Sequence, residues 1–226
     1  MDELHKKPET TDIKSPEIDN FKAIKPESDM TVNEARSFTD GLLDDLREQN
    51  DGYHTTYEDR LKYTPTEERA SWKDKRGESV CIPNSENPDG KVAKDKLAEY
   101  KLAGIDYKNA EPDFSDCCGS EVKIDNMSEN RDNYYDKNGS GQPGNFSQAD
   151  IKCAEKWNAE NKDGKNDWTP RGVVDRRKDN TCSWHECCDT KTMQLVPREI
   201  HSFFTHSGGV AECKARDNNI GGGYDD

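Results

Sequence analysis

Three of the five histidines of this chain lie within twenty-two residues, in the run SWHECCDTKTMQLVPREIHSFFTHSGG. His185 stands beside Glu186 in what reads as a short strand, while His201 and His206 follow Pro197, which suits the first turn of a helix. A neutral imidazole titrates near working pH and suits a general base. Imidazole and carboxylate groups also bind divalent metals. The segment therefore predicts one compact unit that holds a metal beside a general base.

Two strands and a helix must position these groups. The sequence predicts strands over 181–186 and 192–196 and a helix over 198–205, ended by Gly208-Gly209 at its C-cap. Strand, turn, strand and helix, with a histidine at the end of the first strand, resembles the layout of the ββα-metal nucleases. Phosphodiester hydrolysis needs a base, a cation that stabilises charge, and groups that position the backbone.

Further elements are expected upstream. Thr169 followed by Pro170 is a helix start, with Thr169 as N-cap and the helix running to about residue 178. The other expected elements are helices over 94–102 and 146–161, the latter with Ile151, Ala154 and Trp157 on one stripe, and a strand over 122–124.

A small basic patch precedes the histidine segment, in Arg171, Arg176, Arg177 and Lys178. Such a cluster is either a solvated helix face or a track for phosphates, and it lies where a phosphate track would be needed.

Composition limits the rest. Of 226 residues only 30% are hydrophobic and 35% are charged, so we expect part of the chain to lack a core. We expect a linker region over 1–70 with one short helix over 31–46, a folded domain over 71–214 and a flexible tail over 215–226. The net charge of −14 argues against a protein that coats nucleic acid.

No apolar run is long enough for a membrane span, and the N-terminus has no apolar core of a secretory signal. We therefore expect a protein made in the cytoplasm that leaves its cell, if at all, through a specialised secretion system.

The eight cysteines allow three interpretations. Without a secretory signal, reduced thiols are expected, although an even number also permits disulfides. A structural zinc site from Cys182, Cys187, Cys188 and Cys213 is conceivable, but their spacing departs from the usual C-x2-4-C pairs.

The run WHE, followed by MQLVPREIHSFFTHSGG, resembles the nuclease domain of bacterial polymorphic toxins in the HNH/endonuclease VII superfamily. The upstream stretches RGES, PDFS, DNMSENR and GNFSQADIKCAEKWN are similar to segments that accompany this domain. The resemblance covers roughly residues 71–214 and implies an α+β fold with a small ββα-metal, treble-clef-like core and added helices. The paired cysteines and the acidic balance depart from the family's pattern.

The resemblance also implies roles. His185 is the expected general base, and Glu186, where the Trp-His-His subgroup has a second histidine, is a metal ligand or orients one. His201 and His206 are expected ligands or phosphate contacts, and Gln194 is expected to hold the loop that carries the base. The H-x4-H spacing does not match helical neighbours at i,i+4, which makes His206 the less secure ligand. The candidate sets are thus His185, Glu186 and His201 for catalysis, Glu186, His201 and His206 for metal, and Arg171, Arg176, Arg177, Lys178 and Gln194 for substrate.

These features favour a metal-dependent endonuclease toxin that cuts DNA in a target-cell cytoplasm and has a cognate immunity protein. Mg²⁺ is the expected ion, with Mn²⁺ or Zn²⁺ as alternatives. An RNase on the same fold remains open, because metal and base act on the phosphate. A zinc-binding interaction module without catalysis is the alternative of a different class.

Overall fold

The computed structural model describes residues 52–132, 134–135 and 141–221, all within one compact unit, Gly41–Asp226. The helix expected over 31–46 lies outside these residues. The unit is a small α+β domain of short sheets and helices, as predicted. No helix in the described part of the chain is both long and apolar enough to span a membrane.

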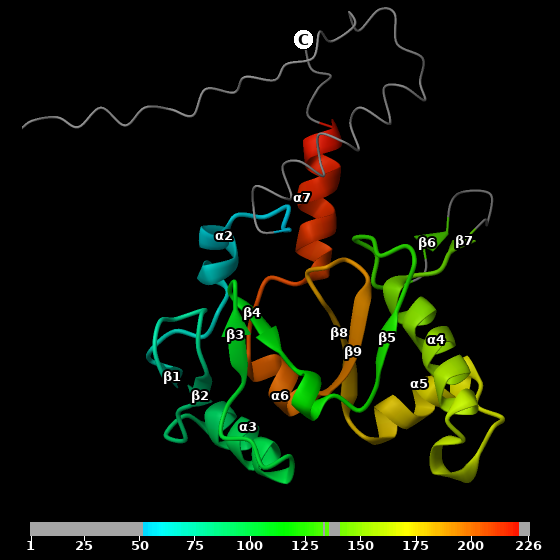
Figure 1. Ribbon diagram of the computed structural model, residues 1–226, viewed down its shortest axis with the longest axis horizontal. Helices are drawn as coiled ribbons and strands as arrows, with labels where there is room; N and C mark the ends of the chain where they lie inside the picture. Colours follow the sequence, from blue (N-terminus) through cyan, green and yellow to red (C-terminus); the bar gives the residue numbers. More distant parts are fainter. Residues whose placement is uncertain (1–51, 133, 136–140, 222–226) are drawn as a thin grey trace, which may run out of the picture. The chain divides into compact units, whose positions relative to one another are not determined.

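A three-stranded antiparallel sheet lies at the centre of the domain (Figure 1). Its strand order is β5 (Glu121–Lys123), β9 (Thr192–Pro197), β8 (Cys182–Glu186), so that β9 is the middle strand. In the register of β8 and β9, His185 lies opposite Gln194. The strands predicted over 181–186, 192–196 and 122–124 are confirmed to within one residue.

The turn between β8 and β9 is held by Asp189. Its carboxylate accepts hydrogen bonds from the backbone N–H groups of Lys191 and Thr192, at 2.9 and 2.7 Å, and from the hydroxyl of Thr192 at 2.6 Å. Such a side-chain-capped turn fixes the register of a hairpin, and with it the position of His185.

Helices cover both faces of this sheet (Figure 1). Helices α4 (Asn145–Ala159) and α5 (Pro170–Asp179) pack on one face, where Trp184 joins a buried apolar cluster. Helices α6 (Arg198–Phe203) and α3 (Pro88–Glu99) lie with the other face, where Val196 joins a second cluster. Because side chains alternate along a strand, His185 faces the second cluster and Glu186 faces α4.

The N-cap of α5 is confirmed: the Thr169 hydroxyl accepts from the N–H of Gly172 at 3.1 Å, and Pro170 occupies the first turn. In α4, Ala154 and Trp157 are buried as expected, whereas Ile151 is exposed. Helix α3 begins at Pro88, six residues before the predicted start, because a proline is tolerated in a first turn.

The Gly208-Gly209 pair does not end a helix. Helix α6 stops at Phe203, and Gly209 begins α7 (Gly209–Gly221), which occupies much of the expected flexible tail. A Cβ on Gly208 would lie 2.9 Å from the carbonyl oxygen of Glu186, and one on Gly209 would lie 2.5 Å from that of Cys187. These glycines let the chain pass closely beside the end of β8.

Residues 52–70, which the composition groups with the N-terminal linker, pack on the domain. They carry α2 (Tyr57–Lys62), where the fully buried guanidinium of Arg60 donates to the carbonyl oxygen of Asn109 at 2.9 Å. Glu212 of α7 is also buried and accepts from the N–H of His54 at 2.5 Å. The polar residues of this segment thus form buried hydrogen bonds with the domain and do not belong to a linker.

The remaining elements are three two-stranded antiparallel sheets and two short 3-10 turns: β1 (Ala70–Trp72) with β2 (Cys81–Pro83), β3 (Asp106–Lys108) with β4 (Glu111–Asp113), β6 (Tyr134–Tyr135) with β7 (Gly141–Gln142), η2 (Ser115–Cys117) and η3 (Lys162–Gly164).

Candidate metal centre and active site

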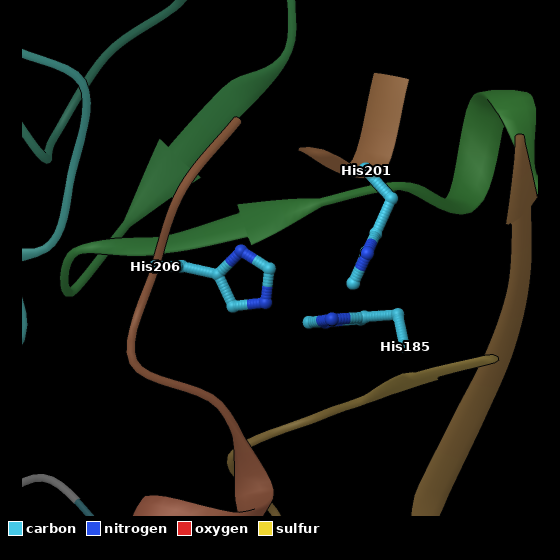
Figure 2. A group of neighbouring side chains, drawn as sticks. All are labelled: His185, His201 and His206. Atoms are coloured by element: carbon cyan, nitrogen blue, oxygen red, sulfur yellow. The ribbon is translucent and has the colours of Figure 1, made fainter. Parts of the chain in front are cut away.

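The three clustered histidines meet in one cavity. Its volume is about 360 Å³, and its walls include His185, His201 and His206 together with Glu186 and Arg131. Figure 2 shows the three imidazole rings pointing toward one another. The ring centroids are 4.5 Å apart for His185 and His206, 5.3 Å for His201 and His206, and 5.4 Å for His185 and His201. One nitrogen of each ring lies within 4.8 Å of one nitrogen of each other ring.

Each ring comes from a different element. His185 is on β8 and His201 on α6, whereas His206 is in the connection between α6 and α7. The expectation that both later histidines share a helix is corrected here. Because the chain leaves the helix after Phe203, the H-x4-H spacing places no restriction on His206. A bond of 2.7 Å between its Nδ1 and the carbonyl oxygen of Phe204 fixes its ring and leaves Nε2 for the cavity.

Three ring nitrogens in this cluster lack protein partners. Nδ1 and Nε2 of His185 and Nε2 of His201 are buried, and none has a hydrogen-bond partner in the described part of the chain. A buried polar atom without a partner is unfavourable by about 1–3 kcal/mol. Three imidazoles with inward-facing nitrogens therefore fit a divalent metal ion.

Burial also keeps these rings neutral. It lowers the pKa of His185 well below the ordinary value, with smaller contributions from His206 and His201. Burial lowers the pKa of His201 to about 3, helped by His206 and Arg131. The pKa of His206 is lowered by burial, although its bond to the Phe204 carbonyl opposes the shift. Neutral imidazoles bind metals without first releasing a proton.

These shifts predict an acid-sensitive metal-free protein. The unfolded chain protonates His201 below a pH of about 6.5, whereas the folded chain does so only near pH 3. Stability should thus fall with acidification between these values, by on the order of 1 kcal/mol per pH unit for this histidine. Chemical denaturation of metal-free wild type and His201→Asn should show the steeper loss in wild type. Equal pH slopes would contradict the shift.

Glu186 lies at the edge of the same cavity but on the α4 side. Its Oε1 accepts from Nδ2 of Asn145 at 2.9 Å, and its Oε2 accepts from Nε of Arg131 at 3.2 Å. The groups with metal-ligand spacing among the described residues do not include it. Strand alternation turns Glu186 away from His185, toward α4, so it lies outside the histidine group, and its role as a metal ligand stays a prediction.

Sequence reasoning missed Arg131, Asn145 and Phe114. The side chain of Arg131 is 61% exposed at the cavity, while Asn145 is fully buried and also bonds the backbone of Ser128. Phe114 packs its ring against His185 with centroids 5.0 Å apart. All three fall within the stretches DNMSENR, GNFSQ and PDFS, whose similarity to segments of the nuclease family could have identified them.

The basic residues expected to contact substrate are placed elsewhere. Arg171, Arg176, Arg177 and Lys178 are on α5, and none of them lines the histidine cavity. Arg177 forms a bidentate ion pair with Asp150: its Nε donates to Oδ1 at 3.0 Å and its Nη2 to Oδ2 at 3.1 Å, and both side chains are nearly buried. That pair secures α5 to α4 without any phosphate. 

Arg176 and Arg171 also have acidic partners. Arg176 pairs with Asp163 at 3.0 Å, and Arg171 pairs with Asp175 at 3.1 Å one turn along the helix. Nε2 of Gln194 donates to Glu121 at 2.9 Å. Its contribution to the site is the strand register opposite His185.

Replacing Arg177 tests its structural role. Arg177→Ala leaves the Asp150 carboxylate buried without its cation and should destabilise the domain by about 3–5 kcal/mol. Arg171→Ala, which removes an exposed pair, should change stability by less than about 1 kcal/mol. Urea denaturation checks both. A small effect of Arg177→Ala, combined with a selective loss of substrate binding, would instead support the phosphate-track interpretation.

All eight cysteines are free thiols in the structure. Cys182, Cys187, Cys188 and Cys213 do not form one of the groups with metal-ligand spacing found among the described residues. Cys188 and Cys213 instead bond backbone carbonyl oxygens of Ser207 and Met127.

Comparison with known proteins gives one family match. No curated protein and no solved structure matches the chain significantly. Residues 104–208 match the family model described as the DNase/tRNase domain of colicin-like bacteriocins. The matched range contains all three cavity histidines as well as Glu186, and the match supports a bacteriocin-type nuclease toxin domain in this part of the chain.

Proposed function

We propose that this chain is a metal-dependent endonuclease toxin of the HNH type that hydrolyses phosphodiester bonds, with DNA as the favoured substrate. The observation that carries the proposal is the convergence of three neutral imidazoles beside Glu186 and Arg131, with buried, unpartnered nitrogens on His185 and His201.

In this proposal His185, His201 and His206 hold the metal. A bound divalent ion supplies Lewis-acid stabilisation of the negative charge that develops on the phosphate and the leaving oxygen. The all-nitrogen donor set favours Zn²⁺ or another transition metal over the Mg²⁺ expected from the sequence, since Mg²⁺ prefers oxygen ligands.

The base is then reassigned from His185 to Glu186. His185 is 1% exposed, and in this proposal its imidazole binds the metal, so it is not free to act as the base. Glu186 has one oxygen fixed by Asn145 and the other held by Arg131, whose side chain extends to solvent.

Arg131 and Glu186 then act together. The guanidinium of Arg131 binds a phosphate oxygen of the substrate, as arginine does in many phosphate sites. Its movement toward the phosphate frees Oε2 of Glu186 to accept a proton from the attacking water. Asn145 keeps the carboxylate in place throughout.

RNA is the second candidate substrate, because the matched family description names both DNase and tRNase domains. Groups that act on a phosphate do not by themselves distinguish the two nucleic acids.

The function is tested by incubating the purified full chain with supercoiled plasmid or with transfer RNA, each with Zn²⁺, Mn²⁺ or Mg²⁺ and with EDTA. Nicking of plasmid that EDTA stops supports the DNA endonuclease, and selective cleavage of RNA supports the alternative. Tight zinc binding with no cleavage of either substrate under any ion would refute the nuclease and favour a non-catalytic zinc-binding module.

The partner and the site of action follow as further parts of the proposal. A toxin nuclease endangers the cell that makes it, so we expect a cognate immunity protein, export by a specialised secretion system and action in the target-cell cytoplasm. Co-expression with the product of the neighbouring gene should restore growth to cells that express this chain.

A further inference from the structure

A second group of metal-binding side chains shares His185 with the first. A carboxylate oxygen of Glu111, a ring nitrogen of His185 and the Sγ of Cys187 lie within 4.8 Å of one another. Ligand atoms around a tetrahedral zinc ion lie about 3.3–3.8 Å apart, given its usual bond lengths. The group therefore needs a contraction of only about 1 Å to hold an ion.

Glu111 is already oriented for such a role. Its Oε1 accepts from the backbone N–H of Cys188 at 2.7 Å, and its Oε2 accepts from the hydroxyl of Tyr53 at 3.1 Å. Ligating carboxylates are commonly fixed by such bonds, which leave further lone pairs on each oxygen.

The unpartnered ring nitrogens of His185 are a second observation, independent of the distances, that indicates a bound ligand. His185 is 1% exposed, and both of its ring nitrogens lack a hydrogen-bond partner in the described residues. The His201–His206 side can use only one of them, so the second nitrogen remains without a partner. A metal ion or an acceptor on the Glu111 side removes that cost.

A separate cavity gives access. Its volume is about 240 Å³, and Glu111, Cys187, Asp113 and Gln194 are among its walls. Glu111 and Asp113 outnumber Lys108, which also lines the cavity, so its acidic groups favour cations. A thiolate selects soft ions such as Zn²⁺ over Mg²⁺.

We propose that Glu111, His185 and Cys187 form a second metal site, which binds a thiophilic divalent cation of the zinc class through the Cys187 thiolate. On binding, the Cys187 thiol releases one proton to solvent and its sulfur donates an electron pair to the ion. Because His185 belongs to both groups, an ion at this site either shares its imidazole or withdraws it from the other two histidines.

Co²⁺ alone serves as the probe, because a cobalt–thiolate bond gives a near-ultraviolet charge-transfer band. The full-length wild type should show this band, and Cys187→Ser should lose it. Cys118→Ser is the matched control, since Cys118 is also partly exposed but belongs to no such group, and it should keep the band. A band that persists in Cys187→Ser, or Co²⁺ binding to wild type without a band, would overturn the proposal.

A second measurement uses the wild-type protein, so that its result does not depend on whether a variant folds. Zn²⁺ should slow alkylation of Cys187 by iodoacetamide at least about tenfold, measured by mass spectrometry of the peptide, while Mg²⁺ should have no effect. Equal rates with and without Zn²⁺ would contradict the site.

The His201→Ala variant separates this site from the proposed nuclease function. It removes a ligand of the first site only, so the cobalt–thiolate band should remain. If wild type cleaves neither nucleic acid but shows the band, the proposed function fails and the second site stands.

Discussion

Replacing His201 by alanine should reduce metal-dependent cleavage of plasmid by about 10³-fold or more. A bound ion contributes several kcal/mol of transition-state stabilisation, and each 1.4 kcal/mol is about a tenfold change in rate. His201 is one of three converging imidazoles, and the described residues offer no other nitrogen in this group to replace it. Initial rates of plasmid nicking at fixed metal concentration measure the effect.

The metal-free stability of this variant distinguishes a ligand from a structural histidine. Nε2 of His201 is buried without a partner, so its removal should leave the unfolding free energy of the metal-free protein unchanged or slightly higher. Stabilisation by added Zn²⁺ should be largely lost. His54→Ala is the control, because this imidazole does not line the cavity. A large loss of metal-free stability, with Zn²⁺ stabilisation retained, would show that His201 is structural.

Replacing Glu186 by glutamine should lower the cleavage rate by about 10²–10⁴-fold, the usual contribution of a general base. The amide has almost the same shape, and its oxygen still accepts from Asn145 at the position where Glu186 does so at 2.9 Å. It cannot accept a proton from water near neutral pH. Metal affinity should change by no more than about threefold, since Glu186 lies outside the histidine group.

Calorimetric titration with Zn²⁺ beside the kinetic assay separates these effects. Glu121→Gln is the control, because it changes an exposed acid on β5 that pairs with Gln194. A Glu186→Gln protein that loses metal binding along with activity would restore the ligand role expected from the sequence. One that keeps more than half of its rate would exclude Glu186 as the base.

Local sequence signals predicted the elements that carry the site. Thr169-Pro170 fixes the start of α5 through a side-chain cap and a proline in the first turn, both of which act within four residues. The strands β8 and β9 likewise lie where the sequence predicted them, to within one residue. The sequence also predicted that His185, His201 and His206 lie together, and the structure places their rings in one cavity.

What escaped prediction depends on contacts distant in sequence. Glu186 meets Arg131 and Asn145, which are 55 and 41 residues away, so its partners do not follow from its neighbours. The role of Arg177 is decided by Asp150, 27 residues earlier. The pair Gly208-Gly209 resembles a helix end by composition, but glycines are needed here because the backbone passes close to the end of β8.

The most direct test of the central claim measures metal content and plasmid nicking in the same samples. Protein stripped with EDTA is dialysed against graded concentrations of Zn²⁺ or Mn²⁺, and bound metal is counted by atomic absorption. We predict no nicking by stripped protein and a rate that rises in proportion to occupancy of the histidine site. Stripped protein that nicks plasmid as fast as loaded protein would contradict the account.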